Sequence, residues 1–138
     1  MAQKPNFSEL FADSHEAEQH LCTQIRLGIH QKQTFEEVAQ LANACYHSCI
    51  LDHFQKEEIL LQALPKEDLV RKKTRNRQKR LRGLQKKLHT LPRRKAVTLA
   101  LIEEELQLYI RFERKELFPY LESYWEGANW DQIESKLN

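Results

Sequence analysis

The stretch Tyr109–Glu122, YIRFERKELFPYLE, is the part of the sequence that decides the fold. It continues a row of apolar residues at every third or fourth position, the spacing of a buried helix face, and that row also includes Glu113. A carboxylate buried without a partner destabilises a protein by several kcal/mol. The row therefore predicts a packed helix on which Glu113 meets a partner inside the protein. Its members are Ile102, Leu106, Tyr109, Glu113, Leu117 and Tyr120.

The composition of the 138 residues favours helices throughout. Three residues are glycine and four are proline, whereas leucine, glutamate, lysine, arginine and glutamine, which are good helix formers, are abundant. A chain of this length buries one core, and it has neither an apolar run that could span a membrane nor the pattern of a signal peptide. We therefore expect an all-α, single-domain, cytoplasmic protein without membrane contact.

Capping residues and prolines divide the chain into four long helices. Asp13 and Thr34 each precede a glutamate by three residues, the pattern of a capping box, and Pro65 and Pro92 suit the first turn of a helix. Because short loops join the helices, we expect one domain, residues 1–138, folded as an up-down-up-down antiparallel four-helix bundle. The predicted helices span 13–27, 34–64, 66–89 and 92–124, and a short helical turn spans 129–136.

The second predicted helix also carries polar residues on its apolar row. His53 and Glu57 lie four residues apart, so both side chains lie on the inward face. On the first predicted helix, His15 lies at the edge of the apolar face. If these side chains meet Glu113 in the interior, they form a set of nitrogen and oxygen ligands that suits iron, manganese or zinc. The partner of Glu113 would then be a metal ion.

Two sequence stretches resemble the signatures of a known family. HFQKEE, which begins at His53, and the opening stretch resemble the second-helix and fourth-helix signatures of hemerythrin-like (HHE cation-binding) domains. In that family each signature supplies a histidine and, four residues later, a carboxylate, and the later one ends in LFP, here 117–119. The resemblance implies a left-handed four-helix bundle with an oxo-bridged di-iron centre, which binds or senses oxygen, or stores or senses iron.

The chain departs from the family at two ligand positions, so the site is open to three interpretations. Tyr109 stands where the fourth-helix signature has its histidine, and the expected inward residue of the third helix is Gln78. The first interpretation is a metal-free network of His53, Glu57, Tyr109, Gln78 and Glu113, in which an inward-leaning Arg77 replaces the charge of the metal. The second is a reduced metal site, with Tyr109 as a phenolate ligand or a hydrogen-bond donor. The third is a shift of register that turns some of these groups to water. The residues that match the family are His15, His53, Glu57 and Glu113.

Positive charge is concentrated in the third predicted helix and the loop that follows it. Residues 71–95 include thirteen Lys or Arg and no acidic residue, although the net charge of the chain is only +2. The chain's own glutamates at 103–105, an acidic protein partner, a second copy or a nucleic acid could balance this charge. The absence of aromatic residues from 65–108 argues against base stacking. The candidate basic surface consists of Arg71, Lys72, Lys73, Arg75, Arg80 and Arg82.

The sequence supports two hypotheses about function. The first is a non-enzymatic hemerythrin-like domain with an altered non-haem iron site, or a site for another divalent metal, that has a sensing or binding role and can also be metal-free. The second is an interaction module whose basic third helix binds an acidic protein partner or a nucleic acid. The two differ in a measurable way, because only the first predicts metal in the purified protein.

Overall fold

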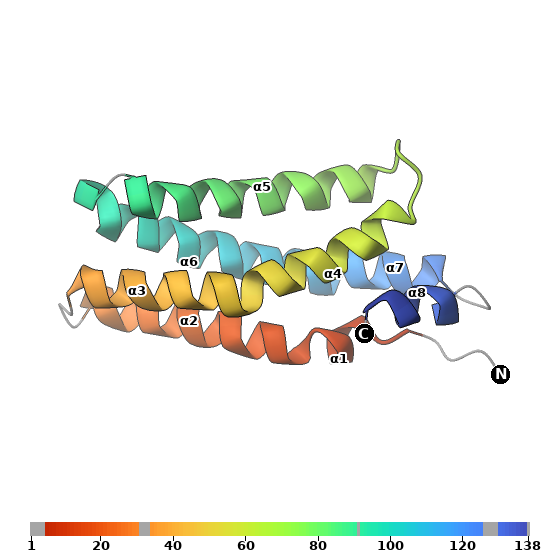
Figure 1. Cartoon of the computed structure of the whole chain (residues 1–138), viewed down its shortest axis with the longest axis horizontal. Helices are drawn as coiled ribbons and strands as arrows, with labels where there is room; N and C mark the ends of the chain where they lie inside the picture. The colour runs from red at the N-terminus through yellow and green to blue at the C-terminus, as the bar shows by residue number, and fades with distance from the viewer. Residues whose placement is uncertain (1–4, 31–33, 91, 126–129, 138) are drawn as a thin grey trace.

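All secondary structure in the described part of the chain is helical (Figure 1). The computed structural model describes residues 5–30, 34–90, 92–125 and 130–137, and the all-α prediction is confirmed. The α-helices are α1 (Phe7–Leu10), α2 (Ala12–His30), α3 (Phe35–Cys45), α4 (Leu51–Gln62), α5 (Leu69–Thr90), α6 (Lys95–Phe112), α7 (Phe118–Tyr124) and α8 (Trp130–Leu137). Two π-helical segments, η1 (Tyr46–Ile50) and η3 (Glu113–Leu117), and one 3₁₀ segment, η2 (Pro92–Arg94), complete the set.

The long helices lie side by side along the length of the molecule (Figure 1). Without a break, α3 continues through η1 into α4, and α6 continues through η3 into α7. Helix α2 leads away from the end where both chain termini lie, and the α3–α4 helix returns to it; α5 and the α6–α7 helix repeat this course. Helix α6 packs against both α2 and α5, and α3 packs against α2. The inward faces of all these helices therefore meet along one axis.

Two helix starts differ from the sequence prediction. Helix α5 begins at Leu69 rather than at residue 66, because an Asp68 carboxylate oxygen accepts a hydrogen bond from the Arg71 backbone N–H at 3.0 Å and caps the helix there. At the N-terminal end Asn6 caps α1, whereas Asp13 lies inside α2 and caps no helix. Residue 129, the predicted start of the C-terminal turn, lies outside the described residues.

Two apolar clusters fill the interior, and a group of polar side chains lies where they meet. One cluster includes Ile25 and Leu106 of α2 and α6, and the other includes Phe7 and Trp130 near the termini. His53 contacts both, because its ring packs on Phe11 of the second cluster and against Phe54 of the first. Across the described ranges, no helix is long and apolar enough to cross a membrane.

Candidate metal centre

Both long interrupted helices deliver a site residue next to a π-helical segment. His53 follows three residues after the end of η1, and Glu113 is the first residue of η3. A π-helical turn holds one extra residue and changes the direction of the side chains that follow, which is why such turns are frequent at functional sites. His15 comes from α2, which has no such segment. Three separate helical runs thus supply the polar group.

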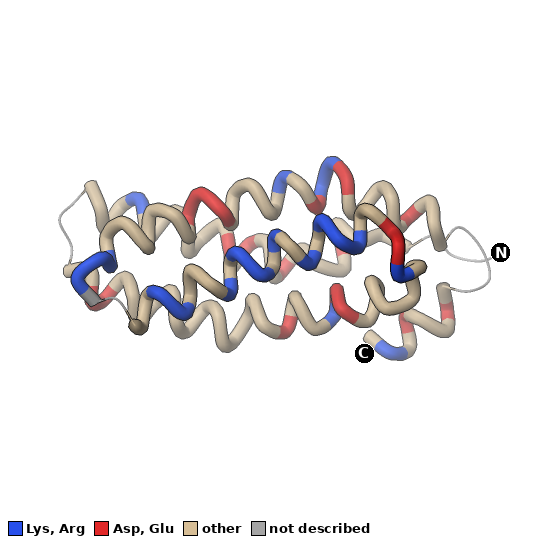
Figure 2. Tube along the Cα trace, turned by 90° about the horizontal axis from the view of Figure 1, so that it is seen from above, with Lys and Arg blue, Asp and Glu red and all other residues tan. Residues whose placement is uncertain are grey.

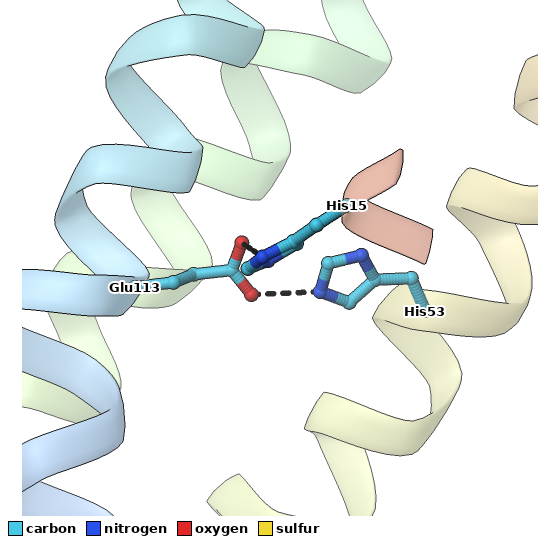
Figure 3. Close-up of side chains that lie close together, drawn as sticks. All are labelled: His15, His53 and Glu113. Carbon is cyan, nitrogen blue, oxygen red and sulfur yellow. Dashed lines mark hydrogen bonds and ion pairs between the residues drawn. The ribbon is translucent and has the colours of Figure 1, made fainter. Parts of the chain in front are cut away.

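Glu113 links the two histidines (Figure 3). One of its carboxylate oxygens lies 3.0 Å from Nε2 of His15, and the other lies 2.7 Å from Nε2 of His53. All three side chains are buried, so the interpretation in which these groups face water is wrong. Each residue offers one ligand atom, and the three atoms lie within 4.8 Å of one another. This buried group could hold a metal ion.

Glu57 lies beside this group and is held from one side only. Its Oε1 accepts hydrogen bonds from the Tyr109 hydroxyl and, at 3.0 Å, from the Gln78 amide, which also donates to the Tyr109 oxygen. Its Oε2 lies 3.3 Å from Nε2 of His53 but has no hydrogen-bond partner. Tyr109 thus acts as a donor to Glu57, and Glu57 keeps a free, buried oxygen next to the His53–Glu113 pair.

Glu18 completes the polar group, and it is absent from the residues expected from the sequence. Its Oε1 lies 2.6 Å from Nδ1 of His53, and its other oxygen has no hydrogen-bond partner. Glu18 is three residues after His15 on α2 and is 1% exposed. A carboxylate on the second nitrogen of a ligating histidine fixes the tautomer and the orientation of the ring. The row His15, Glu18, Cys22, Ile25 has helical spacing and could have identified Glu18.

Burial and mutual charge set the protonation of the group. Desolvation raises the pKa of Glu113 well above its usual value, and the charge of Glu57 raises it further. Desolvation opposes a charge on His53, but the charges of Glu57 and Glu113 outweigh it and raise the pKa of His53. The pKa of His15 falls to about 4, mainly through desolvation and then through the charge of His53. These directions favour a positive charge on His53 and a proton on Glu113 when no metal is bound.

The expected ion pair with Arg77 is not found. The Arg77 guanidinium lies 4.8 Å from the centre of the Phe112 ring, because its long side chain reaches out along the apolar surface while the charge remains near water. In the described residues no Lys or Arg forms an ion pair with Glu18, Glu57 or Glu113. Three buried carboxyl groups therefore face one imidazolium and no other internal cation.

Aromatic rings surround the two imidazoles, and one of the imidazoles reaches the surface. The Phe11 ring stacks on His53 with a centroid distance of 4.7 Å, and the Phe118 ring stacks on His15 at 5.6 Å. These rings exclude water from most of the group. His15, however, also lines a surface pocket of about 230 Å³ together with Ser8, Glu16 and Arg114. A small molecule that approached the group through this pocket would meet His15 first.

Most of the residues of the candidate basic surface contact the chain's own side chains. Four of the six make a hydrogen bond or ion pair to groups at or near the α4–α5 connection and on η3, and Arg82 lies 5.6 Å from the centre of the Phe54 ring. Arg80 has no ion pair among the described residues. The four contacts are Arg71 to the Leu64 carbonyl, Lys72 to Glu67, Lys73 to Glu116 and Arg75 to Glu58.

Comparisons with family models, with curated proteins and with solved structures found no match to this chain.

Proposed function

We propose that this protein is a hemerythrin-like domain, an up-down four-helix bundle, that holds one non-haem metal ion in a sensing or binding role. The ion would lie between His15, His53, Glu57 and Glu113. A set of two imidazoles and carboxylate oxygens suits iron, manganese or zinc, and two histidines with one carboxylate are typical of ferrous iron. We therefore take iron as the first candidate.

The unpartnered Oε2 of Glu57 is the observation that carries this proposal. A buried carboxylate oxygen is costly unless a donor or a cation meets it. Oε2 lies 3.3 Å from Nε2 of His53, a separation that fits two atoms bound to one ion at about 2.1 Å each. A divalent ion would also offset the excess of carboxyl groups in this interior.

The residues on the α5 side favour one ion over two. Gln78 donates its amide N–H to Glu57, and Tyr109 donates its hydroxyl to the same oxygen. Desolvation, followed by the charges of Glu57 and Glu113, raises the pKa of Tyr109 well above its usual value, which favours its hydroxyl as a hydrogen-bond donor to Glu57 over a phenolate ligand. A second ion next to Glu57 would find no nitrogen ligand on this side.

The other polar residues would orient the ligands. Glu18 would accept the Nδ1 proton of His53 and so turn the lone pair of Nε2 toward the ion. Gln78 and Tyr109 would hold Oε1 of Glu57, which leaves Oε2 for the ion. A bound metal ion supplies coordination positions that a small ligand can occupy, and the pocket at His15 offers such a ligand a route from solvent.

Elemental analysis of untagged protein, purified from cells supplied with iron, tests this proposal. We expect about one metal ion per chain, and none in a His53→Gln variant. His47→Gln is the matched control, because His47 is an exposed histidine near the same helix run, and it should keep its metal. Metal-free protein that also shows no thermal stabilisation by Fe²⁺, Mn²⁺ or Zn²⁺ would contradict the proposal and favour the metal-free network.

The second candidate function is an interaction module based on the basic helix α5. It is favoured by Lys79, Arg80, Lys86 and Lys87, which have no ion pair among the described residues. Binding to an acidic surface through these cations would weaken as salt is added. The test is an Arg80→Glu/Lys87→Glu variant on an acidic resin. If this variant is retained as strongly as the unaltered chain, the result counts against this function.

A further inference from the structure

The cations of α5 fall into two groups along the helix. Those up to Arg77 are engaged, because they contact glutamates, a backbone carbonyl or the Phe112 ring. Beyond Arg77, Lys79, Arg80, Lys86 and Lys87 are exposed and have no ion pair in the described part of the chain. Figure 2 shows Lys and Arg at positions spread along most of the length of α5. Apart from Arg82, which lies over the Phe54 ring, the cations of the later half therefore have no ion pair or aromatic contact within the described residues.

A surface groove of about 350 Å³ lies between this half of α5 and α6. Arg80 and Lys87 line it on α5, with Gly83 and Leu84 between them, and Leu101 and Glu105 line it on α6. A methyl group added at Gly83 would meet no atom within 4 Å. Glycine weakens a helix interior, and internal packing gives no reason for it here. A close approach from outside the molecule is a physical reason for a glycine at this point.

Helix α6 adds an exposed apolar stripe next to the groove. Val97, Leu101 and Leu108 are 60%, 42% and 37% exposed, and their spacing places them on one side of the helix. Glu104 lies on the same side, Glu105 faces the groove, and neither has an ion pair among the described residues. Apolar side chains exposed in a row with polar neighbours are typical of a protein interface.

We propose that two copies of this chain associate through the α5–α6 face, which comprises Arg80, Gly83, Leu84, Lys87, Val97, Leu101, Glu104, Glu105 and Leu108. This face carries cations on one helix and acids on the other, so it is complementary to itself. In a two-fold contact each residue pair occurs twice. Helix α6 of one copy would lie over Gly83 of the other, and its glutamates would meet Arg80 and Lys87.

The same residues disfavour a nucleic acid on this face. Glu104 and Glu105 would repel phosphate groups, and the exposed leucines offer no aromatic ring on which a base could stack. Nor does an acidic partner use the whole face, because it would leave the glutamates of α6 next to its own negative charge. A second copy satisfies the cations, the acids and the apolar stripe together.

Sedimentation equilibrium over a wide range of protein concentration tests the association. We expect the chain to shift from monomer to dimer as its concentration rises, and Leu101→Lys to remain monomeric. Leu27→Lys is the matched control, because Leu27 is 39% exposed on α2, and it should dimerise as the unaltered chain does. Circular dichroism melts verify that both variants are folded. A chain that is monomeric throughout, or a Leu101→Lys variant that dimerises normally, overturns the proposal.

Charge complementation tests the pairing of the two helices. An Arg80→Glu/Lys87→Glu variant has an acidic face, and a Glu104→Lys/Glu105→Lys variant has a basic face. We expect each to be monomeric alone and an equal mixture of the two to form a dimer that weakens with salt. If the two variants each dimerise alone, or if their mixture stays monomeric, the proposed pairing of α5 with α6 of the other copy is wrong. A chelator in every sample makes the result independent of the proposed metal ion.

Discussion

The two sides of the candidate metal centre differ in the side chains that reach it. Helices α2 and α4 and segment η3 bring imidazoles and carboxyl groups, whereas α5 brings the neutral amide of Gln78. Yet α5 is the helix with the most charged residues in the molecule. Its Lys and Arg side chains are long enough to reach the surface. Those up to Arg77, together with Arg82, meet glutamates, a backbone carbonyl or aromatic rings there.

Charged residues that lie close to site residues in the sequence thus need not contact the site. The Arg77 guanidinium lies over Phe112, and the adjacent inward position holds the amide of Gln78. The carboxyl groups of α2, α4 and η3 therefore have no cation from α5 beside them. The resulting excess of buried carboxylates on one side, with a neutral side opposite, is the arrangement that a single bound cation would balance.

Removing a carboxylate from the charged side should have the largest effect. In Glu113→Gln the amide keeps an oxygen acceptor for His53 and a donor for His15, so we expect the free energy of unfolding of the metal-free protein to change by less than about 1 kcal/mol. Metal affinity should fall by more than about 100-fold. Calorimetric titration with Mn²⁺ and urea unfolding measure the two effects. Glu116→Gln, at an exposed position on η3, should change neither.

Adding nitrogen ligands to the neutral side should abolish the difference between the two sides. The double variant Gln78→His/Tyr109→His places imidazoles next to Oε1 of Glu57, where an amide and a hydroxyl now lie. We expect the bound metal to rise from about one to about two ions per chain. Elemental analysis measures the ratio, with Gln85→His on the same helix as the control. An unchanged ratio in the double variant would show that the neutral side does not limit the number of ions.

A smaller effect is expected from the residue that orients His53. Glu18→Gln replaces the carboxylate next to Nδ1 of His53, so the ring loses its charged acceptor and its preferred tautomer. We expect metal affinity to fall by about 10- to 100-fold, measured by competition with a chelating dye. Glu16→Gln, at an exposed neighbouring position on α2, is the control. An equal loss in both variants would attribute the effect to surface charge.

The smallest effect is expected from a substitution on the outer side of α5, which should change only the free energy of unfolding. Gly83→Ala adds a methyl group where no atom lies within 4 Å, so the gain in helix propensity is not offset by a clash. We expect the free energy of unfolding to rise by about 1 kcal/mol, measured by urea unfolding of dilute protein. A decrease would mean that the outer side of α5 is packed more closely than the groove indicates.

The sequence predicts much of this arrangement because helical spacing determines which side chains point inward. The rows through His53, Glu57 and Glu113 lead to side chains that the structure buries. Glu18 belongs to a similar row on α2, but a glutamate on a charged helix resembles an exposed residue until its partner is known. The position of Arg77 does not follow from spacing at all, because a long side chain can turn outward from an inward-leaning position.

The spacing of apolar residues does not predict where the helices start or where the π-helical turns lie. Pro65 suits a first turn, but the Asp68 side chain caps α5 three residues later, and both residue types are common near helix starts. No residue pattern marks η1 or η3, because an extra residue in a turn replaces one backbone hydrogen bond by another of similar strength.

The extra residue in η1 has a consequence for any related sequence. It offsets the helical numbering between α3 and α4, so positions before Tyr46 and after Ile50 follow separate registers. A sequence with one residue fewer inside this segment could form an ordinary α-helix here and still place His53 on the same side relative to α3, because the π-helical turn accommodates the extra residue. Replacing the π-helical turn by an α-helix without removing a residue would instead rotate His53 by about 100° relative to α3 and carry the imidazole away from the interior. A relative of the same length is therefore expected to keep this turn if it keeps the site.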